Sequence, residues 1–234
     1  MTTLRIDVWS DIACPWCFVG KRRLEAALER FEHRDAVELH WRSFELDPSA
    51  PRQVDTEAVP YVERLAKKYG ASAEHAQGMI DQMTERAAGD GLSFRFDRIQ
   101  PGNTFDAHRL IHLAAEHGKQ DAMKEAFFRA YLEEGVAIGD VEAIAKVAID
   151  TGLEADAVQG VLQSDAFASD VRLDEQQAAQ LGIRGVPFFV LDRRYAIQGA
   201  QDADAVLSVL RKAHQELSGP LEVVEGAACG PDGC

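Results

Sequence analysis

The chain has 234 residues, 46% of them hydrophobic, which is enough to bury a substantial core. Its formal net charge of -14 argues against binding to nucleic acids or to anionic membranes, because both depend on clustered Lys and Arg. No stretch approaches the roughly 18 consecutive apolar residues of a membrane span, and residues 1–5 lack the pattern of an export signal. We therefore expect a globular, cytoplasmic protein.

The N-terminal region is predicted to form a βαβ unit. Residues 4–9 (LRIDVW) are short and rich in β-formers, which predicts a strand. In residues 18–31 the apolar side chains recur at helical spacing. Residues 37–44 then alternate apolar and polar side chains, as a strand does.

The middle of the chain, from about residue 57 to about residue 179, has a mostly helical pattern. Within it, residues 92–96 alternate like a brief strand or an extended lid segment. Asn103 and Thr104 are suited to cap a helix that begins near Phe105. Residues 188–191 and 195–197 predict a hairpin, and residues 202–217 predict a closing helix.

The four cysteines form two closely spaced pairs near the ends of the chain, Cys14 with Cys17 and Cys229 with Cys234. In a cytosol that keeps thiols reduced, such pairs are typical of redox or metal chemistry rather than of structural disulfides. The pairs therefore direct attention to thiol chemistry.

The first pair follows the first predicted strand, with Cys14 at the N-terminus of the helix. There, unpaired backbone N–H groups and the helix dipole favour a thiolate, which is the form that attacks disulfides. Cys17 is predicted to be the buried resolving thiol. Pro15 fits the first helical turn, and Trp16 covers the site with apolar surface. A zinc site and an inert structural pair are the alternatives.

Three segments together resemble the DsbA family of thioredoxin-fold proteins and, within it, the FrnE-like group. They are residues 9–22 (WSDIACPWCFVGKR), 103–110 (NTFDAHRL) and 182–190 (GIRGVPFFV). The resemblance spans about residues 4–217 and implies an α/β, thioredoxin-like fold with a large helical insertion. Residues 1–50 and 180–217 are expected to form a discontinuous thioredoxin-like domain. Residues 51–179 would form the helical insertion subdomain, and residues 218–234 a flexible C-terminal tail.

The resemblance also implies a thiol/disulfide oxidoreductase or disulfide isomerase that acts on protein or small-molecule disulfides. Val186 and Pro187 match the cis-proline loop that faces the cysteines in this family, so Pro187 joins Cys14 and Cys17 as a catalytic candidate. The candidates for substrate binding are Pro15, Trp16, Val186 and Asn103. The Pro-Trp spacer between the cysteines departs from the Pro-His spacer of the strongly oxidising members.

Cys229 and Cys234 enclose Gly-Pro-Asp-Gly, which favours a tight turn, and FrnE-like proteins resemble this sequence in carrying a second cysteine pair at the C-terminus. We expect an auxiliary redox pair on a tail long enough to reach the active site. A metal site and a pair without a role are the alternatives.

Three further polar residues have two interpretations each. His108 and His112 lie one helical turn apart, which suits a metal, although surface or hydrogen-bonded histidines fit the pattern better. Asp7 is either the buried acid that takes protons from the second cysteine in many thioredoxin-fold enzymes or a salt-bridged edge residue.

The expected partners are disulfide-containing proteins or low-molecular-weight thiols, and glutathione is a candidate redox partner. No metal and no bound cofactor are expected, and the protein is expected to be a monomer or homodimer. One rival function is that of a glutathione-dependent isomerase or transferase of the kappa-class type, in which Ser usually stands where this chain has Cys14. The other is a zinc-binding or holdase protein.

Overall fold

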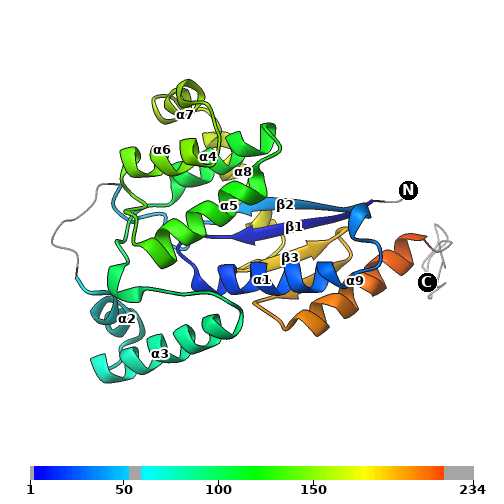
Figure 1. The fold of residues 1–234 in the computed structure, drawn as a ribbon, viewed down its shortest axis with the longest axis horizontal. Coiled ribbons are helices and arrows are strands. Elements are labelled where there is room, and N and C mark those ends of the chain that lie inside the picture. Colours follow the sequence, from blue (N-terminus) through cyan, green and yellow to red (C-terminus); the bar gives the residue numbers. More distant parts are fainter. Residues whose placement is uncertain (1–2, 53–58, 219–234) are drawn as a thin grey trace, which may run out of the picture.

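The computed structural model describes residues 3–52 and 59–218, and its centre is a four-stranded mixed sheet. The strand order is β2-β1-β3-β4 (Figure 1). The strands are β1 (Leu4–Ser10), β2 (Val37–Ser43), β3 (Phe188–Leu191) and β4 (Tyr195–Gln198).

The predicted opening unit and the predicted hairpin are both confirmed. β1 and β2 are parallel and are connected through α1 (Pro15–Glu29). β3 pairs antiparallel with both β1 and β4. The hairpin turn contains Asp192 and Arg193 at φ angles of 48° and 58°, and turns with positive φ at both central residues match the twist of paired strands.

Two helices cover one face of the sheet, namely α1 and α9 (Ala203–Ser218), which pack against each other (Figure 1). Leu4, Ile6 and Val8 of β1 are fully buried in the core that includes α1, as the alternation of side chains along a strand requires. Trp9 of the same strand belongs to a second, smaller cluster with Ile183. The sheet therefore buries apolar side chains on both faces.

The helical run predicted between β2 and β3 is confirmed, whereas its status as a separate subdomain stays a prediction. Figure 1 shows its helices in two groups, α2 with α3 and α4 to α8. The helices are α2 (Tyr61–Tyr69), α3 (Ala73–Gly89), α4 (Phe105–Glu116), α5 (Gln120–Arg129), α6 (Val141–Asp150), α7 (Ala155–Leu162) and α8 (Ala168–Gln180). Short 3-10 turns occupy Arg34–Ala36 and Phe96–Arg98, and a π-helical turn, Ala130–Glu134, follows α5. In the described part of the chain, no helix is both long and apolar enough to span a bilayer.

Two local predictions within this region have different outcomes. The cap is confirmed for Asn103, because α4 begins at Phe105 and the Phe105 N–H donates a hydrogen bond to Asn103 Oδ1 at 2.9 Å. Thr104 is the N-cap residue, but its side chain makes no capping hydrogen bond. Residues 92–96, predicted as a brief strand or an extended lid segment, do not form a strand, because no strand of the described residues pairs with them. Leu92 and Phe94 are buried while Ser93 and Arg95 are exposed, and the lid alternative stays a prediction. The alternation therefore reflects one-sided burial without a sheet.

The start of α1 lies where the sheet meets both groups of inserted helices (Figure 1). The ring of Phe18 on α1 stacks on Phe128 of α5, with ring centroids 5.0 Å apart, and also on Phe94. α5 is thereby held against the first turns of α1. The loop that carries Cys14 consequently lies among elements that are far apart in the sequence.

Candidate active site

The first turn of α1 carries both cysteines of the predicted pair, and both are free thiols. Cys14 is the N-cap residue, Pro15 is the first helical residue, and no acidic side chain lies in the first turn. The Cys17 N–H donates to the Cys14 carbonyl at 3.0 Å. Cys14 thus lies beside the unpaired N–H groups of a helix N-terminus, where a negative charge is favoured.

The two sulfurs have different surroundings. Cys14 is 6% exposed and lines a cavity of about 450 Å³, whereas Cys17 is 0% exposed and does not line this cavity. Burial raises the pKa of the Cys17 thiol well above its usual value, and the adjacent Cys14 raises it further. These surroundings suit a nucleophilic Cys14 and a resolving Cys17, as the sequence predicts.

The loop before β3 faces Cys14. The Val186–Pro187 peptide bond is cis, and the Cys14 Sγ lies 3.5 Å from the Val186 carbonyl oxygen, to which it donates a hydrogen bond. Pro187 packs against α1 at Gly20, where an added Cβ would lie 3.0 Å from Pro187 Cγ. The absence of a side chain at Gly20 therefore allows this close approach.

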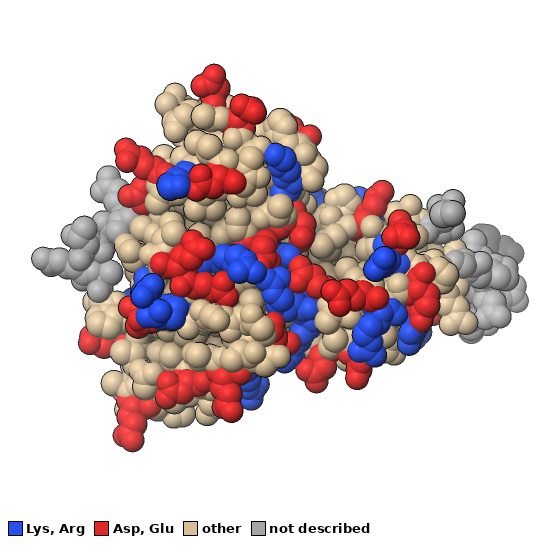
Figure 2. Space-filling view, in the orientation of Figure 1, with Lys and Arg blue, Asp and Glu red and all other residues tan. Residues whose placement is uncertain are grey.

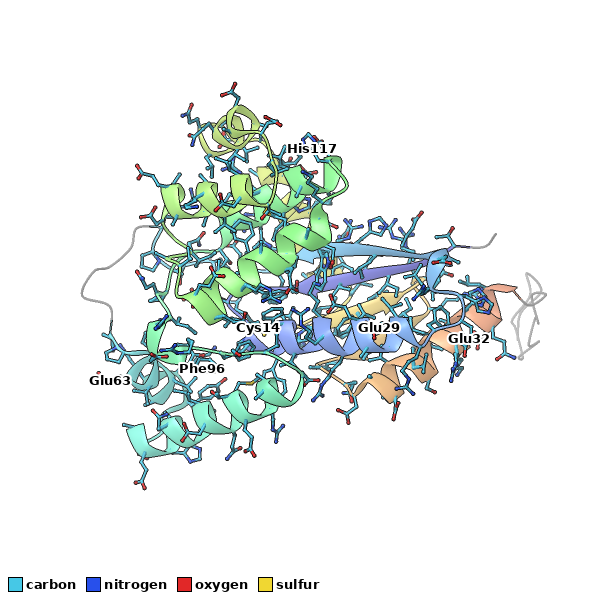
Figure 3. The ribbon with its side chains drawn as sticks, viewed as in Figure 1. Cys14, Glu29, Glu32, Glu63, Phe96 and His117 are labelled. Atoms are coloured by element: carbon cyan, nitrogen blue, oxygen red, sulfur yellow. The ribbon has the colours of Figure 1, made fainter. Side chains whose placement is uncertain are left out.

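The cavity beside Cys14 is walled by three parts of the chain. Pro15 and Trp16 line it next to Cys14, and Val186 lines it from the loop before β3. Residues of α2 and α3 form much of the remaining wall, together with Phe96. Figure 3 shows Cys14 at the N-terminal end of α1, on the side of the molecule where Phe96 lies. Three of the four predicted substrate-binding residues therefore share this cavity.

The fourth, Asn103, does not line the cavity. Its side-chain amide donates to Glu45 Oε1 at 3.2 Å and to the Pro48 carbonyl at 3.4 Å, and its Oδ1 accepts from the Phe105 N–H. These contacts assign Asn103 to the junction between the β2–α2 loop and the start of α4. Substrate binding by Asn103 stays a prediction.

Three charged or titratable side chains are buried beneath the active turn, namely Asp11, His108 and Lys124. Asp11 accepts hydrogen bonds from the N–H groups of Leu46 at 2.7 Å and Ala13 at 3.3 Å, and its Oδ1 lies 3.5 Å from His108 Nε2. Burial acts to raise the pKa of Asp11, but the interaction with His108 and the other contacts lower it overall. Asp11 therefore holds the turn before Cys14 as a carboxylate.

Lys124, on α5, is 1% exposed, and its ammonium donates to the Ser10 carbonyl at 3.3 Å. The ammonium also lies over the Phe128 ring, 5.1 Å from the centroid. No carboxylate of the described residues lies within ion-pair distance of it. Burial lowers its pKa to about 8, and the Cys17 thiolate is the charge that most favours its protonated form. Conversely, the charge of Lys124 lowers the pKa of Cys17.

Asp7 is a salt-bridged residue and is not positioned as the proton acceptor of Cys17. Its carboxylate binds Arg5 at 2.8 Å and Arg42 at 2.7 Å, and it lines a different cavity from Cys14. Burial acts to raise its pKa, but hydrogen bonds from Arg5 and Arg42 lower it overall. The buried acid nearest the active turn is instead Asp11, which follows β1 directly.

His108 and His112 do not form a metal site together. His112 Nε2 lies 3.1 Å from Ser43 Oγ and 3.2 Å from Asp174 Oδ2, while His108 faces Asp11. Among residues 3–52 and 59–218, no group of three or more metal-ligating side chains is present. Cys229 and Cys234 lie outside the described residues, so the auxiliary pair stays a prediction.

Sequence reasoning missed Lys124 and Asp11, and it missed two cations of the cavity wall, Lys68 on α2 and Arg86 on α3. Asp11 lies within the recognised segment 9–22, which was a usable signal. Lys124 stands beside Met123 and ahead of Phe127 on the buried face of α5, and a lysine in an apolar stripe was also a signal. Lys68 and Arg86 had no local signal, because only the packing of α2 and α3 brings them to Cys14.

Known proteins resemble the chain over most of its length. Residues 5–211 match the model of the DSBA-like thioredoxin domain. The probable DsbA oxidoreductase SCO1869 from Streptomyces coelicolor, known from a crystal structure, is 46% identical to this chain in sequence. The two structures superpose with a TM-score of 0.86, and the match covers 99% of this chain and 98% of that chain. The uncharacterized protein YwbO of Bacillus subtilis (strain 168) is 30% identical over 192 residues, which is 81% of this chain and 87% of YwbO.

A more distant structure shares the fold alone. It is that of a putative protein disulfide isomerase from Nitrosomonas europaea, with a TM-score of 0.67 and 20% identity over 93% of this chain and 100% of that chain. The predicted DsbA-like thioredoxin fold is confirmed by these matches.

Proposed function

Because the chain belongs to the DSBA-like thioredoxin domain family, we propose that it is a thiol/disulfide oxidoreductase or disulfide isomerase that works through Cys14 and Cys17. The observation that carries this proposal is the difference between the two sulfurs at one helix N-terminus. Cys14 borders a cavity and contacts the Val186 carbonyl, whereas Cys17 is fully buried behind it.

In the reducing direction, the Cys14 thiolate attacks one sulfur of a substrate disulfide, and the other substrate sulfur leaves as a thiolate. The Cys17 thiolate then attacks Cys14 in the mixed disulfide, and the remaining substrate thiol leaves. The substrate gains two electrons, and the Cys14/Cys17 pair becomes a disulfide. The oxidising direction is the same sequence of steps in reverse.

The second step requires Cys17 to lose a proton inside the protein. Burial opposes this loss because it raises the pKa of Cys17, but the buried charge of Lys124 favours the thiolate. Lys124 thus assists the reaction electrostatically, since its charge stabilises the Cys17 thiolate, which appears only during the reaction.

Trapping experiments test this assignment. Cys17→Ser should accumulate a mixed disulfide between Cys14 and a small disulfide such as oxidised glutathione, because no resolving thiol remains. Cys14→Ser should form no such adduct at the active turn. Mass spectrometry of each variant, with Cys229 and Cys234 replaced by Ser, locates the adduct. If the adduct forms on Cys17 in the Cys14→Ser variant as fast as on Cys14, the assigned roles are wrong.

The presence of cysteine at both positions favours redox exchange over a kappa-class isomerase or transferase, which would not need Cys17. Titration of the pair against reduced and oxidised glutathione tests glutathione as the redox partner and gives the reduction potential.

Truncation of the chain after Ser218 tests the predicted auxiliary pair, Cys229 and Cys234. We expect the truncated protein to fold and its disulfide-isomerase turnover to change. Cytoplasmic location and oligomeric state stay predictions.

A further inference from the structure

The cavity beside Cys14 is enclosed on the side away from the sheet by α2 and α3. Its volume of about 450 Å³ falls in the range of pockets that hold small organic molecules, about 300–1,000 Å³. Cys14 and Val186, whose sulfur and carbonyl are in contact, line this cavity together with residues of α2 and α3. The space next to the reactive thiol is thus shaped for a compact ligand.

The charge of this cavity is opposite to that of the chain. The sequence contains 39 Asp and Glu against 25 Lys and Arg, and Figure 2 shows acidic residues scattered over the visible face, with Lys and Arg gathered near its middle. Yet the described residues that line the cavity include Lys68 and Arg86 and no Asp or Glu. The described lining of the cavity therefore attracts an anion and opposes it with no carboxylate.

Within the described residues, these two cations have no carboxylate partner and contact aromatic rings instead, Lys68 with Tyr69 and Arg86 with Trp16. No described carboxylate lies within ion-pair distance of Lys68 or Arg86, whereas Arg22 and Arg23 nearby on α1 are both ion-paired. The Arg86 guanidinium lies 5.7 Å from the centroid of the Trp16 ring. Because Trp16 lies between Cys14 and Cys17 in the sequence, Arg86 reaches the active turn. As far as the described residues go, both cations can therefore bind an external anion without losing an ion pair.

The rest of the wall is apolar and adaptable. Met79 and Met83 of α3 line it, with Tyr61 of α2 and Phe96, whose rings lie 5.0 Å apart. Methionine side chains adjust to ligands of irregular shape, and aromatic rings offer flat apolar contacts. The wall thus suits an apolar body attached to the anionic group.

We propose that this cavity binds small organic disulfides and thiols that carry a carboxylate and an apolar body, with the anion held by Lys68 and Arg86 and the sulfur at Cys14. This inference rests on the proposed function and names its substrate class. Reduction proceeds as above: one substrate sulfur bonds to Cys14 while the other leaves with its electron pair, and Cys17 then releases the second thiolate.

The test compares two small disulfides, the dianion dithiobis(nitrobenzoate) and the uncharged dithiodipyridine. The full chain with Cys229→Ser and Cys234→Ser is reduced, freed of reductant, and mixed with each probe while the released thiol is followed by absorbance. Lys68→Gln and Arg86→Gln should each slow the reaction with the dianion about fivefold, and about twentyfold together. The rate with the uncharged probe should change by less than about twofold.

Lys67→Gln is the matched control, because Lys67 is exposed on the same helix as Lys68 but does not line the cavity. It should leave both rates unchanged. If Lys68→Gln and Arg86→Gln slow both probes equally, or neither probe, the cations do not select an anion and the inference is wrong. If the two variants slow the reaction of an uncharged peptide disulfide as much as that of the dianion, the cavity binds polypeptides and the inference is also wrong. If neither probe oxidises Cys14 and Cys17 at all, the proposed function fails as well.

Discussion

Two lysines are buried where α1 meets α5, and their surroundings differ. Lys21 of α1 is ion-paired with Glu25, with Asp121 at 3.3 Å and with Glu125 at 3.2 Å. Lys124 of α5 contacts a backbone carbonyl and two aromatic rings instead. Burial acts to lower the pKa of both lysines. The carboxylates outweigh it at Lys21, whose pKa is raised, whereas the pKa of Lys124 is lowered to about 8.

Lys21 and Lys124 show two different roles of a buried cation, one in the stability of the fold and one in the reaction. Lys21 joins α1 to α5 through charges that are present at all times, so its contribution belongs to the fold. An unpaired buried cation such as Lys124 costs free energy, and its strongest attraction is to a thiol that ionises only during the reaction. The expected consequence is that Lys21 matters for stability and Lys124 for chemistry.

The largest expected effect is on the pH dependence of stability. In a Cys14→Ser/Cys17→Ser background, Lys124 loses its proton near or below pH 8 when folded and near pH 10.5 when unfolded. Between these values the unfolded chain binds more protons, so the free energy of unfolding should rise with pH, by about 3 kcal/mol. Urea unfolding from pH 7 to pH 10.5 measures it. A parallel curve for the same protein with Lys124→Met would contradict the assignment.

Removing Lys21 should affect stability next most strongly. Lys21→Met leaves Asp121 without an ion-pair partner among the described residues, while Glu25 and Glu125 keep Arg22. We expect a loss of about 2 kcal/mol in the free energy of unfolding at pH 7. Lys124→Met should lose none, because it removes an unpaired buried charge. Urea unfolding of the two variants decides the comparison, and equal losses would show that the two lysines are equivalent.

The redox readout should show the opposite order. Lys124→Met should slow the attack of Cys17 on the mixed disulfide about tenfold, or about 1.4 kcal/mol in the barrier, and should shift its pH profile upward because the Cys17 pKa rises further. Lys21→Met should leave this rate unchanged. Rapid acid quenching followed by mass spectrometry measures the decay of the mixed disulfide. An unchanged profile for Lys124→Met would remove Lys124 from the mechanism.

The smallest effect concerns the other side of α1. Gly20→Ala places a Cβ 3.0 Å from Pro187 Cγ and 3.3 Å from Phe189 Cζ, so it should lower the free energy of unfolding by about 1 kcal/mol. It should also slow the reaction of Cys14 with disulfides, because it displaces the Val186–Pro187 loop. Gly160→Ala in α7 is the control. Nothing lies near its added Cβ, and it should stabilise the helix by up to about 1 kcal/mol. Equal stabilisation by both changes would show that the loop yields freely.

Local signals explain the accurate part of the sequence-based prediction. Pro15 at the first position of a helix, the β-forming residues of β1 and the turn before β4 are each recognised from a few neighbouring residues. For residues 92–96, local alternation fits both a brief strand and an extended segment, and the structure has no strand there. Alternating burial is local, whereas pairing with another strand is not.

The spacing of residues predicts the cysteine pair at a helix N-terminus, and the resemblance of three segments to a known family implies the fold class and the Val186–Pro187 loop. The surroundings of the two sulfurs depend instead on how distant helices pack together. Lys124 arrives from α5, and Lys68 and Arg86 arrive from α2 and α3, at positions set by helix packing. Helix packing brings together residues that are far apart in the sequence. The pKa values of the two thiols depend on the burial and on the distances to charges that result from this packing, and no short stretch of sequence contains those distances.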